Sequence, residues 1–218
     1  MNKKMILDLC GGTGSWSRPY KEAGYDVEVL TLPAWDVTKV EFESNAMEFI
    51  RQDTHYLDTK CVLYKDIYGI LAAPPCTEFS IAKGNQPRNL EAALEVVNSC
   101  IRIIHSCRLK GNLKFWALEN PRGLLRQFLG IPHFTFEHWE YGNEQIKPTD
   151  IWGYFKEPAK TVKVKPEQLT VKFGTRTNGR GWAKPECPEE YKHMNLNRAA
   201  IRAITPQGFA EAFYKANR

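Results

Sequence analysis

The sequence contains no apolar run close to the roughly 20 residues that a helix needs to cross a bilayer. Its six cysteines include no Cys-x-x-Cys pair, so we expect neither a zinc module nor any other metal site. The basic start of the chain reaches Asp8 within a few residues, which is not typical of a secretion signal. These absences predict a cytoplasmic protein with no membrane contact, whose cysteines are thiols rather than disulfides.

The chain also lacks internal repeats and low-complexity tracts. Its 218 residues, 43% of them hydrophobic, suit one globular domain with a small appendage and exclude a large multidomain protein or a disordered chain.

Positive charge is concentrated in the last third of the chain. Residues 147–218 hold 14 Lys and Arg against 7 Asp and Glu, whereas the first 146 residues have a small acidic excess. Within that third, Lys156–Lys184 holds eight basic and two acidic residues, interleaved with aromatics. Clustered cations beside aromatics favour a nucleic acid partner, because phosphate neutralisation releases counterions. A solvated lysine-rich loop is the alternative.

The first two-thirds of the chain alternates between strand and helix patterns. We predict strands at 5–9, 27–30, 67–73 and 115–119 and helices at 17–23 and 89–108. The stretch 41–66 is ambiguous, and we interpret it as a helix around Asn45–Arg51 followed by loop. The alternation predicts an α/β fold, with a mostly parallel sheet covered by helices on both faces.

Chemically distinctive residues follow three of these strands. The first strand ends in a glycine-rich turn, Asp8–Gly14, another in Pro74-Pro75-Cys76, and a third in Glu119-Asn120. Ligands of such sheets bind at the carboxyl ends of the strands, so the three ends are expected to face one crevice.

The glycine-rich turn allows close approach of a ligand to the backbone. It has neither the full Gly-x-Gly-x-x-Gly spacing nor the Lys-Ser/Thr of a P-loop, so a nucleoside-type cofactor fits better than ATP phosphates. A tight turn that binds nothing is the alternative.

A cysteine and a glutamate are the candidate reactive groups. Cys76 follows two stiffening prolines and would act as a nucleophile once deprotonated, unless it is an inert buried thiol. Glu119 ends an apolar strand, where a carboxyl group can have a raised pKa and serve as an acid, or instead pair with Arg122. Cys100 and Cys107 lie beside the apolar face of the predicted long helix and are expected in the core.

Taken together, these segments resemble the DNA (cytosine-5)-methyltransferase family, most closely its short bacteriophage and prophage forms. The similarity covers residues 5–153 and 197–217, in the family's motif order. Five segments carry most of it: Asp8–Gly14, Ala73–Ser80, Leu118–Gly123, Tyr141–Lys147 and Ile204–Phe213.

The resemblance implies a Rossmann-like S-adenosylmethionine-dependent methyltransferase fold with a small basic recognition region. It divides the chain into a catalytic and cofactor-binding part at 1–153, a DNA-recognition part at 154–196, and a C-terminal helix at 197–218 that returns to the catalytic part. The implied partner is double-stranded DNA in a bacterial or phage-infected cell, with a homodimer or an accessory protein compensating for the short recognition part.

The implied reaction is methyl transfer from S-adenosylmethionine to carbon 5 of a flipped cytosine, which leaves S-adenosylhomocysteine. Cys76 would attack carbon 6, Glu119 would hold or protonate the ring nitrogen, and Lys147 would complete the catalytic set.

Binding roles follow from the same resemblance. Residues expected around the cofactor are Asp8, Leu9, Cys10, Gly11, Gly12, Gly14, Trp16, Asp36, Pro74 and Leu90. Residues expected around the cytosine are Pro75, Ser80, Asn120, Gln145 and Thr149. Residues expected on DNA are Lys163, Lys165, Lys172, Arg176, Arg180 and Lys184.

The sequence departs from the family pattern at several positions. Lys147 and Thr149 stand where the family has two arginines, and Cys10 stands where it usually has an aromatic. No acidic residue ends the second strand, and Asp36, several residues later, is the nearest substitute. Two other functions therefore stay open: a DNA- or cofactor-binding relative without turnover, and a methyltransferase acting on RNA or free cytosine nucleotides.

Overall fold

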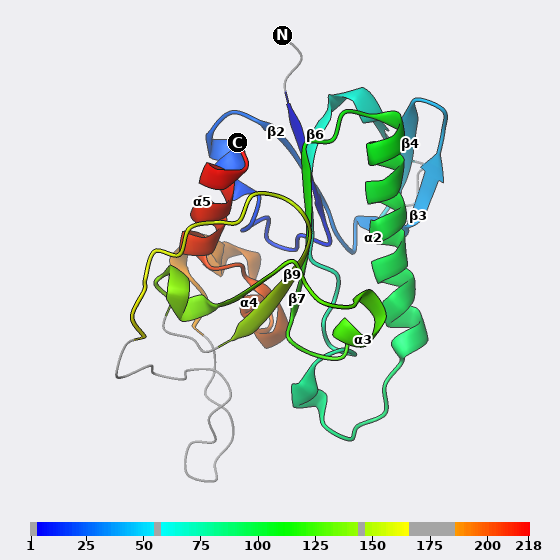
Figure 1. The fold of residues 1–218 in the computed structure, drawn as a ribbon. Helices are drawn as coiled ribbons and strands as arrows, with labels where there is room; N and C mark the ends of the chain where they lie inside the picture. The colour runs from blue at the N-terminus through cyan, green and yellow to red at the C-terminus, as the bar shows by residue number, and fades with distance from the viewer. Residues whose placement is uncertain (1–3, 55–57, 144–146, 166–185) are drawn as a thin grey trace.

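A computed structural model describes residues 4–54, 58–143, 147–165 and 186–218. The fold is mixed α/β, with a six-stranded central sheet in the order β2-β1-β6-β7-β9-β8 and a separate three-stranded sheet in the order β3-β4-β5 (Figure 1). The central strands are β1 (Met5–Leu9), β2 (Asp26–Leu30), β6 (Ile67–Ala72), β7 (Phe115–Pro121), β8 (Phe134–Glu137) and β9 (Pro148–Tyr154). The helices are α1 (Arg18–Glu22), α2 (Leu90–Lys110), α3 (Arg126–Leu129), α4 (Arg198–Ala203) and α5 (Gln207–Ala216).

The central sheet is mainly parallel. Strand β1 pairs in parallel with β2 and β6, and β6 pairs in parallel with β7, while β9 runs antiparallel to both β7 and β8. The inner strands are apolar on both faces because both faces are covered, as Ile6 and Leu7 are both fully buried. The four strands predicted from short apolar runs are therefore confirmed, with ends within two residues of the prediction.

Helices cover the two faces of the sheet. Helix α2 packs on one face and α5 on the other (Figure 1). The apolar face of α2 packs against the core, with its buried residues between Val97 and Cys107, and Cys100 and Cys107 are core residues as predicted. Asn89 caps the helix by accepting a hydrogen bond from the Ala92 amide at 3.1 Å. Among the helices that the structure describes, none combines the length and the apolar character that a membrane crossing requires.

The helix predicted around Asn45–Arg51 is wrong. Strands β3 (Trp35–Phe42), β4 (Ala46–Arg51) and β5 (Thr59–Leu63) form an antiparallel sheet there. Met47 and Phe49, two residues apart, are both buried, which is the period of a strand. Pairing with β3 and β5 decides the conformation, and these partners are not visible in the local sequence.

Candidate functional site

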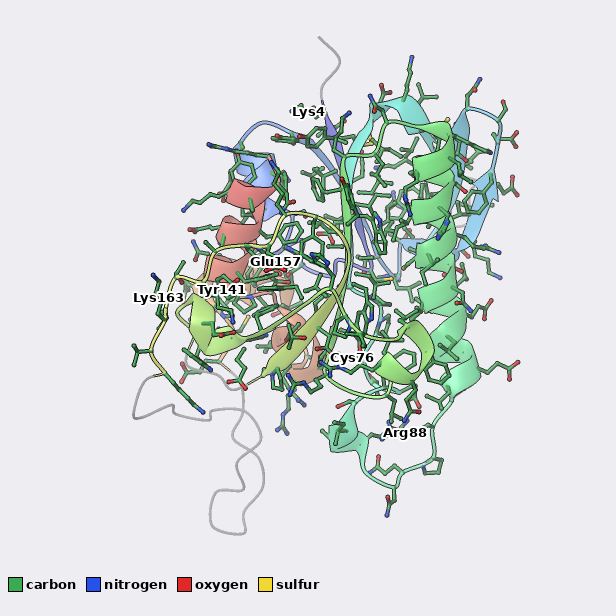
Figure 2. All side chains as sticks on the ribbon, viewed as in Figure 1. Lys4, Cys76, Arg88, Tyr141, Glu157 and Lys163 are labelled. Atoms are coloured by element: carbon green, nitrogen blue, oxygen red, sulfur yellow. The ribbon has the colours of Figure 1, made fainter. Side chains whose placement is uncertain are left out.

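Three segments of the chain meet at the carboxyl ends of the inner strands of the central sheet. They follow β1, β6 and β7, which are consecutive neighbours and run parallel, so their carboxyl ends lie side by side. Cys76 and Arg88 lie toward these ends, far from Lys4 at the opposite end of β1 (Figure 2). The topology thus brings the glycine-rich turn, the Cys76 loop and Glu119 to one place, as the sequence predicts.

The Asp8 side chain packs against the buried side of the glycine-rich turn. This fully buried carboxylate accepts a hydrogen bond from the Ser17 hydroxyl at 2.5 Å, and burial raises its pKa to about 6. A Cβ added at Gly11 would lie 2.3 Å from the Asp8 carboxyl carbon, so the backbone rests directly on that group. Gly12, at φ +56°, would place a Cβ in open space. Asp8 therefore shapes the turn, and Gly12 lies on its open side.

Two further residues expected at the cofactor have partners within the fold. The Trp16 ring is 2% exposed and packs against Phe209 and Phe213 of α5, with ring centroids 5.9 and 5.3 Å away. Asp36 accepts hydrogen bonds from the Thr38 amide and hydroxyl at 2.9 and 2.8 Å.

Three other expected cofactor contacts also lie in the described part of the chain. Leu9 is fully buried, Cys10 (φ 56°) is half-buried in the turn, and Leu90 packs partly buried against the core at the start of α2. The roles of all these residues toward a cofactor stay predictions.

A cavity of about 310 Å³ opens beside the turn. Its walls include Ser15 and Arg18 on one side and Thr205 and Pro206, just before α5, on the other. The Thr205 amide donates a hydrogen bond to the Ser15 hydroxyl at 2.9 Å, which ties the C-terminal segment to the turn. The volume falls at the lower end of the range typical of small-molecule sites.

The Cys76 loop is a tight turn fixed at both of its ends. The Phe79 and Ser80 amides donate hydrogen bonds to the Cys76 carbonyl oxygen at 3.1 and 2.9 Å. The Asn120 side-chain amide donates to the Pro74 carbonyl oxygen at 3.0 Å. Within this loop, Pro74 is buried, Pro75 is exposed and Cys76 is half-buried.

Charged groups influence the pKa of the thiol. Burial raises the pKa of Cys76, and the negative charge of Glu119 raises it further, whereas Lys147 and Arg202 oppose the shift. Burial likewise raises the pKa of Glu119, with Lys147 opposing and Asp150 adding to the increase. The three predicted catalytic residues are therefore close enough to influence one another. The cation that acts on Glu119 is Lys147, whereas Arg122 is exposed on the loop that follows.

Two residues expected around the substrate are hydrogen-bonded to the backbone of Lys147 and Cys76. Thr149 is fully buried; its hydroxyl donates to the Lys147 carbonyl oxygen at 3.2 Å and lies 3.3 Å from Nε2 of His138. The half-buried Ser80 hydroxyl accepts a hydrogen bond from the Ala82 amide at 3.2 Å. Gln145 lies outside the described residues.

Only part of the predicted DNA-binding set can be placed. Lys163 and Lys165 are exposed, and Lys163 lies at the periphery of the molecule (Figure 2). Lys172, Arg176, Arg180 and Lys184 fall in the range 166–185, outside the described residues.

Two arginines near the site have no role in the sequence-based prediction. Arg202 lines the cavity, and its carbonyl oxygen accepts a hydrogen bond from Lys147 Nζ at 3.0 Å. Arg88 donates to the carbonyl oxygens of Glu78, Ser80 and Gly84 at 2.5, 3.0 and 3.1 Å and so holds the loop after Cys76. No local pattern marks Arg202, since it is distant in sequence from every residue it accompanies.

Comparison with known proteins places the chain in a family. The family model for C-5 cytosine-specific DNA methylases matches residues 4–145, a span that includes the glycine-rich turn, Cys76 and Glu119. The type II methyltransferase M.DdeI of Desulfomicrobium norvegicum is 27% identical over 123 residues. The aligned stretch is 55% of this chain and 28% of that relative. Because the family match spans more than half of the chain and contains all three loops of the site, the protein belongs to the C-5 cytosine-specific DNA methylase family.

Proposed function

We propose that this protein transfers a methyl group from S-adenosylmethionine to carbon 5 of cytosine in double-stranded DNA. The observation that carries the proposal is the grouping of Cys76, Glu119 and Lys147 beside the glycine-rich turn, in a chain of this family. The central sheet, with its parallel strands and antiparallel β9, suits the Rossmann-like fold of S-adenosylmethionine-dependent methyltransferases.

The cofactor would lie along the turn and extend toward the cavity lined by Ser15 and Thr205. The open side of Gly12 and the size of the cavity both suit a nucleoside-type ligand. Leu9, Cys10 and Gly14 would contribute backbone contacts, Pro74 and Leu90 would bound the site, and Asp8 would hold the turn in shape. When bound, S-adenosylmethionine supplies an electrophilic methyl group.

Cys76 is the nucleophile of the proposed reaction. Its sulfur bonds to carbon 6 of the cytosine, and the electron pair displaced from the ring double bond makes carbon 5 nucleophilic. After carbon 5 is methylated, loss of its proton restores the double bond and breaks the bond between sulfur and carbon 6. Burial raises the pKa of the free thiol above its ordinary value, which favours the protonated form. The attack requires the thiolate, and the positive charges of Lys147 and Arg202 stabilise that form.

Glu119 holds the ring nitrogen during the attack. A carboxyl group whose pKa is raised by burial keeps its proton more readily and can donate it to the nitrogen as charge develops there. Lys147 would balance the carboxylate after that transfer. Asn120 fixes the loop, and Thr149, Ser80 and Pro75 would border the base.

The cytosine must leave the helix to reach Cys76, because a stacked base does not expose carbon 6 to a side chain. Lys163 and Lys165, with the remaining basic residues of 156–184, would bind the DNA backbone. This function also implies that the protein acts where DNA is accessible, in a bacterial or phage-infected cell.

Methyl transfer from tritiated S-adenosylmethionine tests the proposal. Duplex DNA, RNA and cytosine nucleotides are offered in parallel, with Cys76→Ala as the inactive control and Cys61→Ala, an exposed thiol, as the matched one. Label in DNA with the wild type and Cys61→Ala, but not with Cys76→Ala, supports the proposal. Label in RNA or nucleotides alone would assign one of these as the substrate in place of DNA. DNA binding without transfer to any substrate would identify a relative that has lost turnover.

A further inference from the structure

An ion pair with a buried acidic partner lies close to Glu119. Arg126 of α3 donates two hydrogen bonds of 2.6 Å, one to each carboxylate oxygen of Asp150 on β9, and the Thr135 hydroxyl donates to Oδ1 at 2.9 Å. The Asp150 side chain is fully buried, while Arg126 is partly exposed. A bidentate pair of this kind fixes the relative orientation of the two elements that carry it.

The pair adjoins the residues that hold Cys76. Asp150 is opposite Asn120 in the register of β9 with β7, and Asn120 donates to the Pro74 carbonyl oxygen, two residues before Cys76. Strand β9 therefore pairs with the residue whose side chain holds one end of the Cys76 loop.

The segment that leads into α3 holds the other side of the loop. The Leu124 amide donates to the Phe79 carbonyl oxygen at 2.9 Å, three residues after Cys76. A Cβ added at Gly123 would lie 2.3 Å from the same oxygen, so the two backbones are in direct contact. Residues 120–124 thus contact the loop both before and after Cys76. Arg126, two residues further on, binds this segment to Asp150 of β9.

We propose that Arg126 and Asp150 are positioning residues, which set where the Cys76 sulfur lies by fixing residues 120–124 against β9. The inference rests on the proposed function, because positioning matters only if Cys76 must reach a substrate atom. An ion pair is suited to this task because loss of Arg126 leaves the fully buried Asp150 carboxylate without its charged partner, so arrangements in which the pair is broken are unfavourable. Misplacement of a reacting group by about 1 Å can cost about 100-fold in rate.

Arg126→Ala and Asp150→Asn test the pair, with Arg126→Lys as the conservative variant. The control is Arg108→Ala, an exposed arginine near the C-terminal end of α2. We expect kcat for DNA methylation to fall at least about tenfold in the first two variants, with KM for S-adenosylmethionine and DNA changed by less than about twofold. Arg126→Lys should recover part of the rate.

A second readout needs no turnover. Alkylation of Cys76 by iodoacetamide, followed by mass spectrometry, should become faster in Arg126→Ala as the loop loosens, while the exposed Cys61 reacts as in the wild type. Wild-type kcat and alkylation rates in Arg126→Ala or Asp150→Asn would overturn the inference, as would equal changes in kcat and KM. A wild-type protein without any methyl transfer would instead defeat the proposed function, and the alkylation rates would still decide whether the pair holds Cys76. If Arg126→Ala does not fold, Asp150→Asn and Arg126→Lys carry the same comparison.

Discussion

The Asn120 side chain donates a hydrogen bond of 3.0 Å to the Pro74 carbonyl oxygen, and this contact joins two of the three loops of the site. It connects the end of β7, which carries Glu119, to the loop that carries Cys76. The bond is fully buried on the Asn120 side, so water cannot replace it when it is lost.

Asn120→Asp should slow methyl transfer. The new carboxylate would face the Pro74 oxygen without a donor, which pushes the Cys76 loop away, and we expect a loss in kcat of at least about tenfold. Steady-state methyl transfer measures the effect. Asn112→Asp, the same substitution at an exposed site, is the control and should keep the wild-type rate. Equal rates for Asn120→Asp and wild type would show that this contact does not position Cys76.

The reactivity of Cys76 should depend on its charged neighbours. Its pKa is raised above the ordinary thiol value, so alkylation should speed up only as the pH rises past that value. Lys147→Met and Arg202→Gln remove charges that lower this pKa, so the midpoint of alkylation against pH should move to higher pH. Glu119→Gln removes a charge that raises it and should move the midpoint to lower pH. Identical profiles in all four proteins would refute this electrostatic description.

Asp8 should make stability fall between about pH 4 and 6. Its pKa is raised from 3.8 in the unfolded chain to about 6 in the folded protein, so the folded state binds the proton more tightly. The associated stabilisation is present below the lower value and is lost as the pH rises through the upper one, by about 3 kcal/mol.

Asp8→Asn tests this dependence, because the amide oxygen can still accept from Ser17. The difference in unfolding free energy between variant and wild type should change by about 2 kcal/mol in favour of the variant from pH 4 to pH 7, because part of the effect already lies below pH 4. Urea unfolding at several pH values measures it. A constant difference across this range would contradict the prediction.

Lys163 and Lys165 should contact DNA phosphates. In the double variant Lys163→Glu/Lys165→Glu, the slope of log affinity against log salt should decrease by about two, since each lost phosphate contact lowers it by about one. Fluorescence anisotropy with a labelled duplex measures this slope. Lys39→Glu, an exposed lysine on β3, serves as the control for charge. An unchanged slope in the double variant would exclude both lysines from the interface.

The parts of the fold that could be predicted are those whose pattern of apolar residues lies within one short segment of the sequence. Strands 5–9 and 67–72 are short apolar runs that the fold buries on both faces, and the long helix carries its own periodicity. The helix predicted around Asn45–Arg51 is wrong because the strand that forms there is stabilised by pairing with β3 and β5, which lie outside that segment. Of the site, the sequence predicted Cys76, Glu119 and Lys147 as the catalytic residues, but not the contacts of Asn120 or Asp150.

The sequence by itself determined which reactive groups the protein has, and that Cys76 follows a buried strand while Glu119 lies near the end of another, because these features depend on neighbouring residues alone. Only the tertiary structure decided what holds those groups in place. The hydrogen bonds of Lys147 to the Arg202 carbonyl oxygen, of Arg126 to Asp150 and of Thr205 to Ser15 join residues from different parts of the chain, and such contacts form only when packing brings distant backbones together.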